Sequence, residues 1–450
     1  PLAQCARQAL LFGLDAPRLA QALVGHVATQ QVDDLTQAMQ IAFEIAQPGD
    51  CVLLSPACAS LDQFANYQAR GELFRHWVQR QAASSAGGLG WVMVSSASIG
   101  LLEDTYHYSR QHGVFLLLAT MACVFMLCVP LEVWRQNAAL ILLASIFLLV
   151  LVLLIGQEIN GSKRWIALPG PLPSLQVSEF AKIGLIFYMA AFMSRFAYDL
   201  RRRAFSMWRP LAVLAVPVGL LFFAPDFGGM VVFTVCVIGM LMMSGASLVL
   251  LVGSGALLGS GAVIMVVMEP YRLARWTSFL DPWADQFATG YQLTQALIAF
   301  GRGHVTGTGL GNSVQKLHYL PEAHTDFIFA VIAEELGMIG AIAVVLLFTL
   351  FIARAMLVAR KAELAGHLFG AYVSYGIGFV VAAQAFINMA VSSGLLPTKG
   401  LTLPLMSYGG SSLLVTGVMV GLLLRTDAET RHRPRRASTP YRARHEPRLS

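Results

Sequence analysis

The sequence predicts an all-α polytopic membrane protein with about ten transmembrane helices, a large extracytoplasmic loop and a short soluble α/β fragment at the N-terminus. Hydrophobic residues form 56% of the 450 residues and charged residues only 12%, whereas ordinary soluble domains carry about twice that charged share. Apolar runs of about 20 residues, long enough to cross a bilayer as a helix, recur between residues 114 and 424. A long polar interval, residues 269–326, separates two of these runs and is rich in acids, arginines and glycines.

The first 81 residues form the predicted soluble fragment. Apolar residues recur at helical spacing in 19–24 and 35–43, and a short apolar strand is expected at 51–54. This helix–strand–helix pattern is typical of one piece of an α/β domain. It is too short to bury a complete sheet by itself.

Residues 55–74 read SPACASLDQFANYQARGELF and closely resemble the C-terminal end of the MurD family, the cytoplasmic ligases that add D-glutamate to UDP-MurNAc-L-alanine. The resemblance implies that Ser60 and Tyr67 fall on the D-glutamate positions of that family. The phosphate loop G-x-x-x-x-G-K-[ST] does not occur in this sequence, so we expect no ATP-dependent ligation. The expected status is an inactive remnant or the tail of a larger fusion.

The membrane part is expected to span residues 82–429. Its first span, residues 82–102, is uncharged and long enough to cross but rich in glycine and serine. The nine clearer spans are Val114–Pro130, Ala138–Gly156, Phe180–Phe196, Leu211–Ala224, Met230–Ser244, Leu248–Met268, Phe327–Ala353, Leu368–Ser392 and Gly409–Leu424.

Basic residues set the expected orientation. Arginine and lysine cluster between 195 and 209, between 354 and 361, and in the tail after 425. The positive-inside rule places these clusters and both termini in the cytoplasm, and it places 157–178, 269–326 and 393–408 outside. It also accounts for the net charge of +6 without a nucleic-acid partner. The basic tail 430–450 is expected to be disordered and to act as an anchor at the membrane surface.

The first outer segment carries Lys163, Arg164 and Trp165, followed by Glu179 and Lys182 at the start of a helix. Glu179 and Lys182 are three residues apart and therefore share a helix face. One interpretation is a structural ion pair at the membrane interface, with Trp165 as an interfacial anchor. The other is that the three cations bind the phosphates of a lipid carrier.

Two further positions place acids near apolar segments. Asp226 stands in a Pro-Asp-Phe-Gly-Gly turn and is expected to cap the next helix, unless it is used chemically. Glu334 and Glu335 lie inside an apolar run, where ionisable groups normally face a cavity or a partner. The turn around Lys399 and Ser407 offers backbone N–H groups and one cation to an anion.

Several long motifs resemble the SEDS family of cell-wall polymerases, and among them the division members more than the elongation members. These motifs are DPWAD at 281–285, GLGNSVQKL at 309–317, YLPEAHTDFIF at 319–329 and KGLTLPLMSYGGSS at 399–412. The similarity extends over about residues 90–429. The sequence departs from the family pattern directly after Asp285 and before the Asp226 turn.

This resemblance implies a peptidoglycan glycosyltransferase that polymerises lipid II outside the membrane, with the catalytic aspartate of the family at Asp285. A carboxylate there can act as general base on the acceptor hydroxyl, and a single displacement inverts the anomeric centre. Asp281 is then a support residue. The positions expected to bind substrate or its pyrophosphate are Lys163, Arg164, Trp165, Glu179, Lys182, Arg275, His324, Lys399 and Ser407, with Asp226 and Glu335 in support.

The family resemblance also implies partners: lipid II and lipid-linked glycan, a class B penicillin-binding protein and other divisome proteins at the septum of the inner membrane. A divalent cation, Mg or Mn, is a further candidate for stabilising the pyrophosphate. Two rival functions stay open. A lipid II flippase or transporter would suit ten helices with the intramembrane acids Glu334 and Glu335, and an inactive divisome scaffold would suit the departures from the family pattern.

Overall fold

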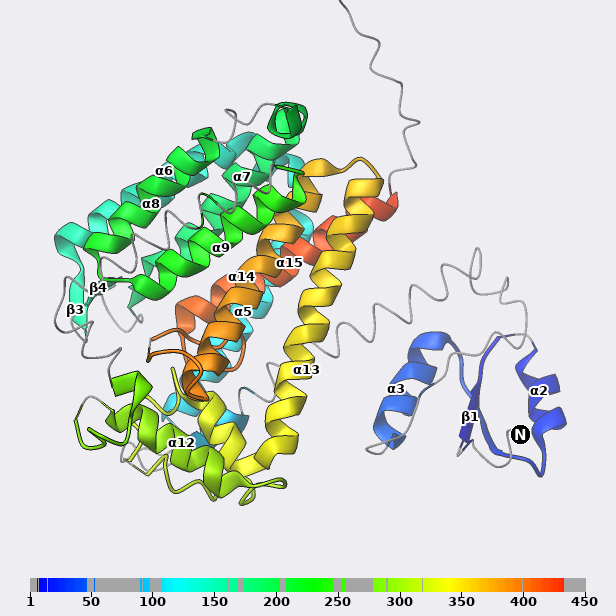
Figure 1. Cartoon of the computed structure of the whole chain (residues 1–450). Coiled ribbons are helices and arrows are strands. Elements are labelled where there is room, and N and C mark those ends of the chain that lie inside the picture. Colours follow the sequence, from blue (N-terminus) through cyan, green and yellow to red (C-terminus); the bar gives the residue numbers. More distant parts are fainter. Residues whose placement is uncertain are drawn as a thin grey trace, which may run out of the picture. The chain divides into compact units, whose positions relative to one another are not determined.

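A computed structural model of the chain consists of two compact units, Pro1–Ser85 and Ala86–Ser450 (Figure 1). Their division lies close to the predicted boundary between residues 81 and 82. The residues that the structure describes are 6, 8–13, 15–46, 52, 90, 92–97, 107–159, 162–167, 174–202, 208–246, 253, 255, 278–288, 290–317, 319–398 and 400–432.

The N-terminal unit contains a β-α-β-α segment. Strands β1 (Gln8–Leu11) and β2 (Ala28–Gln31) pair in parallel, and helix α2 (Ala16–Leu23) connects them. Helix α3 (Leu35–Ile45) follows, and the Asp34 side chain caps it by accepting the Gln37 N–H at 2.8 Å. Both predicted helices are thus confirmed, while β1 and β2 were not predicted. The strand expected at 51–54 and the positions of Ser60 and Tyr67 lie outside the described residues.

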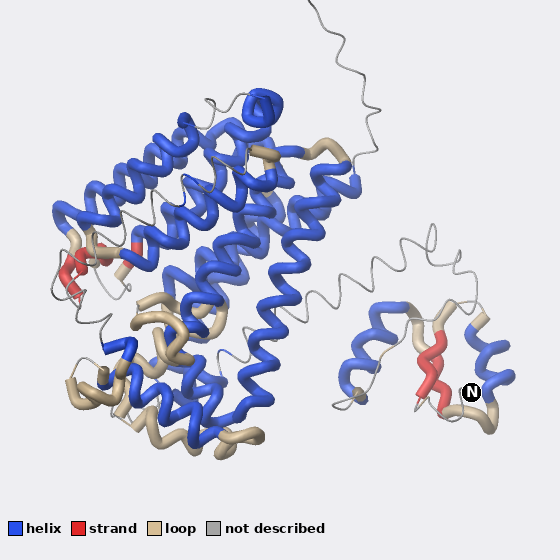
Figure 2. Tube along the Cα trace, in the orientation of Figure 1, coloured by secondary structure: helices blue, strands red, loops and turns tan. Residues whose placement is uncertain are grey.

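The second unit is a bundle of helices (Figure 2). Its helices, in chain order, are α5 (His107–Cys128), α6 (Leu131–Ile155), α7 (Val177–Arg202), α8 (Trp208–Phe223), α9 (Phe227–Met243), α12 (Tyr291–Gly303), α13 (Ile328–Leu364), α14 (Leu368–Ser392) and α15 (Gly410–His432). Three short strands, β3 (Gln157–Ile159), β4 (Ser162–Ile166) and β5 (Leu175–Gln176), form an antiparallel sheet in the order β3-β4-β5.

Six described helices are long and apolar enough to cross a membrane, and two shorter apolar helices, α8 and α9, accompany them. These eight elements fall on eight of the predicted spans. The span expected at 248–268 lies almost wholly outside the described residues, and of the span at 82–102 only residues 90 and 92–97 are described, as helix. The prediction of a polytopic helical membrane protein is confirmed, and the count of ten spans stays a prediction.

Close helix crossings at small residues hold the bundle together. A Cβ at Gly417 of α15 would lie 2.3 Å from the Ala119 carbonyl oxygen of α5, and one at Gly421 would lie 2.5 Å from the Cys123 carbonyl oxygen. This small-xxx-small spacing allows two helix backbones to pack closely. Close packing matters inside a membrane, because the hydrophobic effect contributes little to helix association there. Helices α7 and α14 are mostly buried in the bundle, whereas α5, α6 and α13 expose most of their apolar surface.

Helix α13 bends at Gly337, which has a φ of 66°. A Cβ there would lie 2.3 Å from the Gly307 backbone nitrogen, so only glycine allows this crossing. The chain at 304–309 runs against the bend, where Met338 N donates to His304 O at 3.0 Å and Gly309 N donates to Glu335 O at 3.0 Å. The loop after α12 is therefore fixed to the first turns of α13.

Candidate active site

The three outer segments predicted from the sequence gather at one end of the bundle. Figure 1 shows the β3–β4 hairpin, helix α12 and the loop between α14 and α15 at this end, away from the turn that joins α13 to α14. The polar loop is thus an organised element, with α12 as its helical core.

Arg164 joins the hairpin to the α9 turn. Its Nη1 lies 3.5 Å from Asp226 Oδ1, and its Nη2 donates to the Pro225 carbonyl oxygen at 2.9 Å. Asp226 also accepts the Gly229 N–H at 3.0 Å and so caps α9, as expected. Its side chain is 2% exposed, so the guanidinium offsets a carboxylate that would otherwise be costly to bury.

Strand β4 also carries Lys163 and Trp165. The pairing with β3 is irregular here, because Trp165 and Lys163 face the consecutive residues Gln157 and Glu158 and leave Arg164 without a partner in register. Lys163 is exposed and Trp165 is half-buried. Of the three residues, Lys163 is therefore the one whose charge is open to solvent, while Arg164 is held by its partners.

Glu179 and Lys182 form an ion pair within the bundle. Lys182 Nζ lies 2.7 Å from Glu179 Oε1, and both side chains are nearly inaccessible. Gln384 of α14 approaches the same carboxylate oxygen at 3.5 Å. The predicted shared helix face is confirmed, and the pair is buried within the bundle.

Hydrogen bonds at Ser407 join the loop between α14 and α15 to the loop that precedes α13. The Ser407 hydroxyl donates to the Thr325 carbonyl oxygen at 2.6 Å and accepts the Leu403 N–H at 2.7 Å. Tyr408 N donates to the His324 carbonyl oxygen at 2.9 Å. The Ser407 side chain is 2% exposed. Its hydroxyl is thus engaged by backbone on both sides, which suits positioning of the loops better than contact with a substrate.

His324 packs between two tyrosines. Its ring centroid lies 4.8 Å from that of Tyr108 and 5.7 Å from that of Tyr408. Burial lowers the pKa of His324, and Glu322 opposes that shift. A lowered pKa favours the neutral imidazole at neutral pH.

Asp281 and Asp285 lie in the turn that leads into α12, and both are exposed. Asp281 Oδ1 accepts the Ala284 N–H at 3.3 Å, which is a local supporting contact. The Asp285 carbonyl oxygen accepts the Gly290 N–H at 3.1 Å. A Cβ at Gly290 would lie 2.4 Å from the Pro282 carbonyl oxygen, so the turn requires glycine there. It presents the Asp285 carboxylate at the outer surface of the loop.

Glu334 and Glu335 are fully buried at the start of α13, where each meets a cation. Lys316 Nζ lies 2.8 Å from Glu335 Oε1, and Arg302 Nε lies 3.2 Å from Glu334 Oε1. Ser96 Oγ donates to Glu335 at 2.6 Å, and Ser313 Oγ donates to Glu334. These contacts tie the loop after α12 to α13, so Glu335 helps to hold this loop in place.

Some predicted site residues lie outside the described part of the chain, namely Arg275, Lys399, Ser60 and Tyr67. Ser96 and Ser313 were not singled out from the sequence, and the structure brings them in. Arg302, Lys316 and Asp326 stood among the polar groups of the interval 269–326 that could do chemistry, but no role was assigned to them. Lys316 and Asp326 stand inside the quoted motifs, directly beside apolar residues. Asp326 directly precedes the predicted span Phe327–Ala353, and a charged residue next to a span was the signal that could have identified it.

The described residues contain no cluster of three or more His, Cys, Asp or Glu side chains that could hold a metal ion. Asp226 forms an ion pair with Arg164 at 3.5 Å, and the same guanidinium favours the carboxylate form of Asp326. These residues fit a guanidinium-based site better than a cation site, and no catalytic step is assigned to a metal here.

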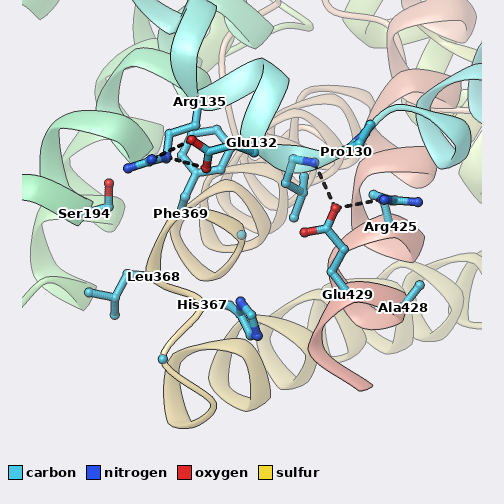
Figure 3. Close-up of a pocket in the computed structure, with 13 residues that line it drawn as sticks. Pro130, Glu132, Arg135, Ser194, His367, Leu368, Phe369, Arg425, Ala428 and Glu429 are labelled. Carbon is cyan, nitrogen blue, oxygen red and sulfur yellow. Dashed lines mark hydrogen bonds and ion pairs between the residues drawn. The ribbon is translucent and has the colours of Figure 1, made fainter. Parts of the chain in front are cut away.

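A cavity of about 690 Å³ lies at the other end of the bundle (Figure 3). The turn between α5 and α6, the start of α14 and the end of α15 line it. Two local ion pairs, Glu132 with Arg135 and Arg425 with Glu429, face this space, and Glu429 also accepts the Leu131 N–H at 2.9 Å. The cavity shares no residue with the outer loops, so we do not assign the reaction to it.

The model of the FtsW/RodA/SpoVE family, described as cell cycle proteins, matches residues 78–432. A probable peptidoglycan glycosyltransferase FtsW of Halomonas elongata is 57% identical over 355 residues, which cover 77% of this chain and 89% of that protein. The probable peptidoglycan glycosyltransferase FtsW of Coxiella burnetii is 46% identical over 352 residues, or 76% of this chain and 93% of that protein.

Solved structures share the fold of the membrane unit. A chain of a peptidoglycan synthase complex, in which polymerization and crosslinking are structurally coordinated, aligns with a TM-score of 0.66 and 29% identity, covering 79% of this chain and 98% of that chain. The rod shape determining protein RodA of Thermus thermophilus aligns with a TM-score of 0.60 and 26% identity, with the same coverage of 79% and 98%.

Proposed function

This chain belongs to the FtsW/RodA/SpoVE family of cell cycle proteins, and we propose that it is a peptidoglycan glycosyltransferase that polymerises lipid II into glycan strands during cell division. It is a multi-pass protein of the bacterial inner membrane. The observation that carries the proposal is the 57% identity with a relative of that name across nearly the whole membrane unit.

The proposed chemistry is a single inverting displacement at the outer end of the bundle. Asp285 takes the proton from the acceptor hydroxyl while that oxygen attacks the anomeric carbon of the lipid-linked chain. Lys163 and Arg164 stabilise the departing pyrophosphate, together with Arg275 and Lys399. The buried Glu179–Lys182 pair acts as support for this end of the bundle and does not contact the substrate.

The proposed partners follow from the relatives. The structural neighbour that belongs to a peptidoglycan synthase complex supports a class B penicillin-binding protein as the crosslinking partner. Lipid II is the proposed substrate, and other divisome proteins are proposed to hold the enzyme at the septum with both termini in the cytoplasm. Accessibility of single cysteines placed at each terminus, measured with a membrane-impermeant label on intact cells, tests this orientation.

Transport of lipid II is the rival proposal, and it relied on the intramembrane acids Glu334 and Glu335. In the structure both carboxylates are neutralised by Lys316 and Arg302 and hold the loop after α12. This structural use accounts for their burial without a transport pathway. The enzyme is thus the function that the geometry supports best.

Purified full-length protein with its class B partner, supplied with labelled lipid II in detergent, tests the proposal. An enzyme gives glycan strands that resolve as a ladder on a gel, and a glycan hydrolase digests the ladder. A flippase gives no ladder but moves labelled lipid II across the bilayer of a proteoliposome. An inactive scaffold does neither and still binds the partner.

We also propose that residues 1–81 are a C-terminal fragment of the MurD ligase family. The parallel β1–β2 pair with its crossover helix α2 is compatible with a piece of an α/β domain, and the family match of the membrane part begins only at residue 78. Joining of two neighbouring cell-wall genes would explain the arrangement. A single transcript reading through both parts is expected, and separate stop and start codons between them would contradict the fusion.

A further inference from the structure

The cavity of about 690 Å³ lies at the end of the bundle opposite the outer loops, between α6, α14 and α15 (Figure 3). Arg360 and Lys361 precede the turn into α14, and the basic tail follows α15, so the positive-inside rule places this end in the cytoplasm. Small-molecule sites commonly have volumes of about 300–1,000 Å³. The proposed glycan synthesis uses none of the residues that line this cavity.

The charges in the cavity wall balance, because two acids and two arginines are among the described residues that line it. Glu132 accepts two hydrogen bonds from Arg135, at 2.8 Å from Nε and at 2.6 Å from Nη2. Glu429 Oε1 accepts Arg425 Nε–H and the Leu131 N–H, both at 2.9 Å. A balanced wall suits a ligand that carries both a positive and a negative charge better than a simple anion.

One positive and one negative group keep a hydrogen-bonding atom unused. Among the described residues, Arg135 Nη1 has no acceptor and Glu429 Oε2 has no donor. Figure 3 shows the Arg135 guanidinium on the side of Ser194 and the Glu429 carboxylate on the opposite side, with the start of α14 between them. The two groups can therefore hold the two ends of one ligand.

The start of α14 adds hydrogen-bond donors to this wall. The N–H groups of Leu368, Phe369 and Gly370 have no partner within the helix, and the N-cap residue His367 gives them no side-chain hydrogen bond. Donors of this kind favour a phosphate group. The His367 ring lines the same space and has no hydrogen-bond partner in the part of the chain that the structure describes.

The cavity also adjoins the apolar surface of the bundle. Pro130 and Leu131, in the turn between α5 and α6, line it. The neighbouring turns of these two helices expose Phe125, with 57% of its surface accessible, and Val133, with 43%. A headgroup bound in the cavity can thus extend its acyl chains along the exposed apolar side chains of α5 and α6.

We propose that this cavity binds the phosphoethanolamine headgroup of a membrane phospholipid. Arg135 and the N-terminus of α14 hold the phosphate, and Glu429 accepts a hydrogen bond from the ammonium. The quaternary ammonium of choline has no N–H to donate, and a glycerol headgroup has no positive charge. The bound lipid joins α6, α14 and α15 and stabilises the folded protein by mass action.

Thermal unfolding of the full-length protein in detergent, measured against the concentration of an added dioleoyl lipid, tests this site. We expect phosphatidylethanolamine to bind about tenfold more tightly than phosphatidylcholine or phosphatidylglycerol. Equal affinity for the three lipids, or a preference for phosphatidylglycerol, would overturn the proposal. Free phosphoethanolamine distinguishes the two sources of this headgroup, and we expect it to bind more weakly. If it binds as tightly as the lipid, the ligand is a soluble molecule and the assignment to a phospholipid fails.

Substitution of each charged group tests how the ligand is oriented. Glu429→Gln still accepts the Leu131 N–H but loses its charge, so it should weaken phosphatidylethanolamine about tenfold and leave phosphatidylglycerol unchanged. Arg135→Gln should weaken both lipids. Glu363→Gln is the matched control, because it removes a carboxylate from the ion pair with Arg360 at the same end without lining the cavity. Wild-type binding by Glu429→Gln, or an equal loss in Glu363→Gln, would contradict the proposed contact.

Ser194→Leu fills the cavity and keeps all its charges. The Ser194 hydroxyl donates only to the Ala191 carbonyl oxygen of its own helix, at 2.8 Å, so we expect an unchanged Tm without lipid and no rise in Tm when phosphatidylethanolamine is added. Thr349→Leu in α13 is the control, because the exposed Thr349 likewise donates within its helix, to Val345 O at 2.8 Å. A wild-type response of Ser194→Leu to the lipid would show that the headgroup binds elsewhere.

Discussion

Arg164 and Asp226 join strand β4 to the N-terminus of α9 through an ion pair of 3.5 Å. Only the arginine reaches solvent, with 22% of its side chain exposed against 2% for the aspartate. The buried Asp226 carboxylate therefore orients the partly exposed Arg164 guanidinium. This guanidinium lies at the end of the bundle that carries the loops.

Removal of Arg164 should destabilise the protein, because a buried carboxylate loses its counter-ion. We expect Arg164→Gln to lower the free energy of unfolding by about 1–3 kcal/mol. Asp226→Asn should cost less, since asparagine can still cap α9. Thermal unfolding in detergent of both single variants and of the double variant measures the coupling. Strictly additive effects would show that the two side chains do not interact.

The Lys316–Glu335 pair, in which both side chains are buried, should be more sensitive than the pair of the buried Glu334 with the partly exposed Arg302. Lys316→Met leaves a carboxylate unpaired in the interior, which costs about 3–5 kcal/mol. Replacement of Arg302, whose side chain is 43% exposed, by glutamine should cost less, because Glu334 keeps hydrogen bonds from the Ser313 hydroxyl and the Val314 N–H. Unfolding in detergent compares the two. Equal losses would contradict the different burial of the pairs.

The crossing of α5 and α15 predicts that Gly417 cannot accept a side chain. Gly417→Ala places a methyl group 2.3 Å from the Ala119 carbonyl oxygen and should cost about 1–3 kcal/mol through helix separation. Gly219→Ala in α8 meets no neighbour within 4 Å and should be neutral or slightly stabilising. Melting temperatures of the two variants give the comparison, and a neutral Gly417→Ala would show that the helices are not packed this closely.

Stability should depend on pH through Asp326. Burial raises its pKa from 3.8 to about 7, so the folded protein holds this proton more tightly than the unfolded chain. Its contribution to stability is fully present below about pH 4 and is lost as the pH rises through about 7. The difference in melting temperature between wild type and Asp326→Asn should therefore grow from pH 5 to pH 8 in favour of the variant. A constant difference would mean that the pKa of Asp326 is not raised.

The sequence predicted those features that depend on local pattern. Apolar runs of bilayer length identified the helices, and a spacing of three residues placed Glu179 and Lys182 on one face of α7. The Pro-Asp-Phe-Gly-Gly turn before α9 predicted that Asp226 caps this helix, and its carboxylate accepts the Gly229 N–H.

Contacts between distant segments were not predictable in the same way. Ser96 and Glu335 are 239 positions apart, and Lys316 and Ser96 are 220 apart. Their meeting depends on how whole helices pack, which no local pattern records. Ser407 is an example of a polar motif whose role depends on such distant contacts. The motif predicted contact with substrate, whereas in the structure the Ser407 hydroxyl is hydrogen-bonded to the backbone of two loops.

The most direct test of the central claim compares Asp285→Asn with Asp281→Asn in lipid II polymerisation by the full-length protein and its partner. The two acids lie in the same exposed turn, so that similar effects on folding are expected. If Asp285 is the general base, Asp285→Asn lowers kcat about 100-fold or more, while Asp281→Asn keeps most of the activity. Glycan strands formed by Asp285→Asn at the wild-type rate would contradict the account.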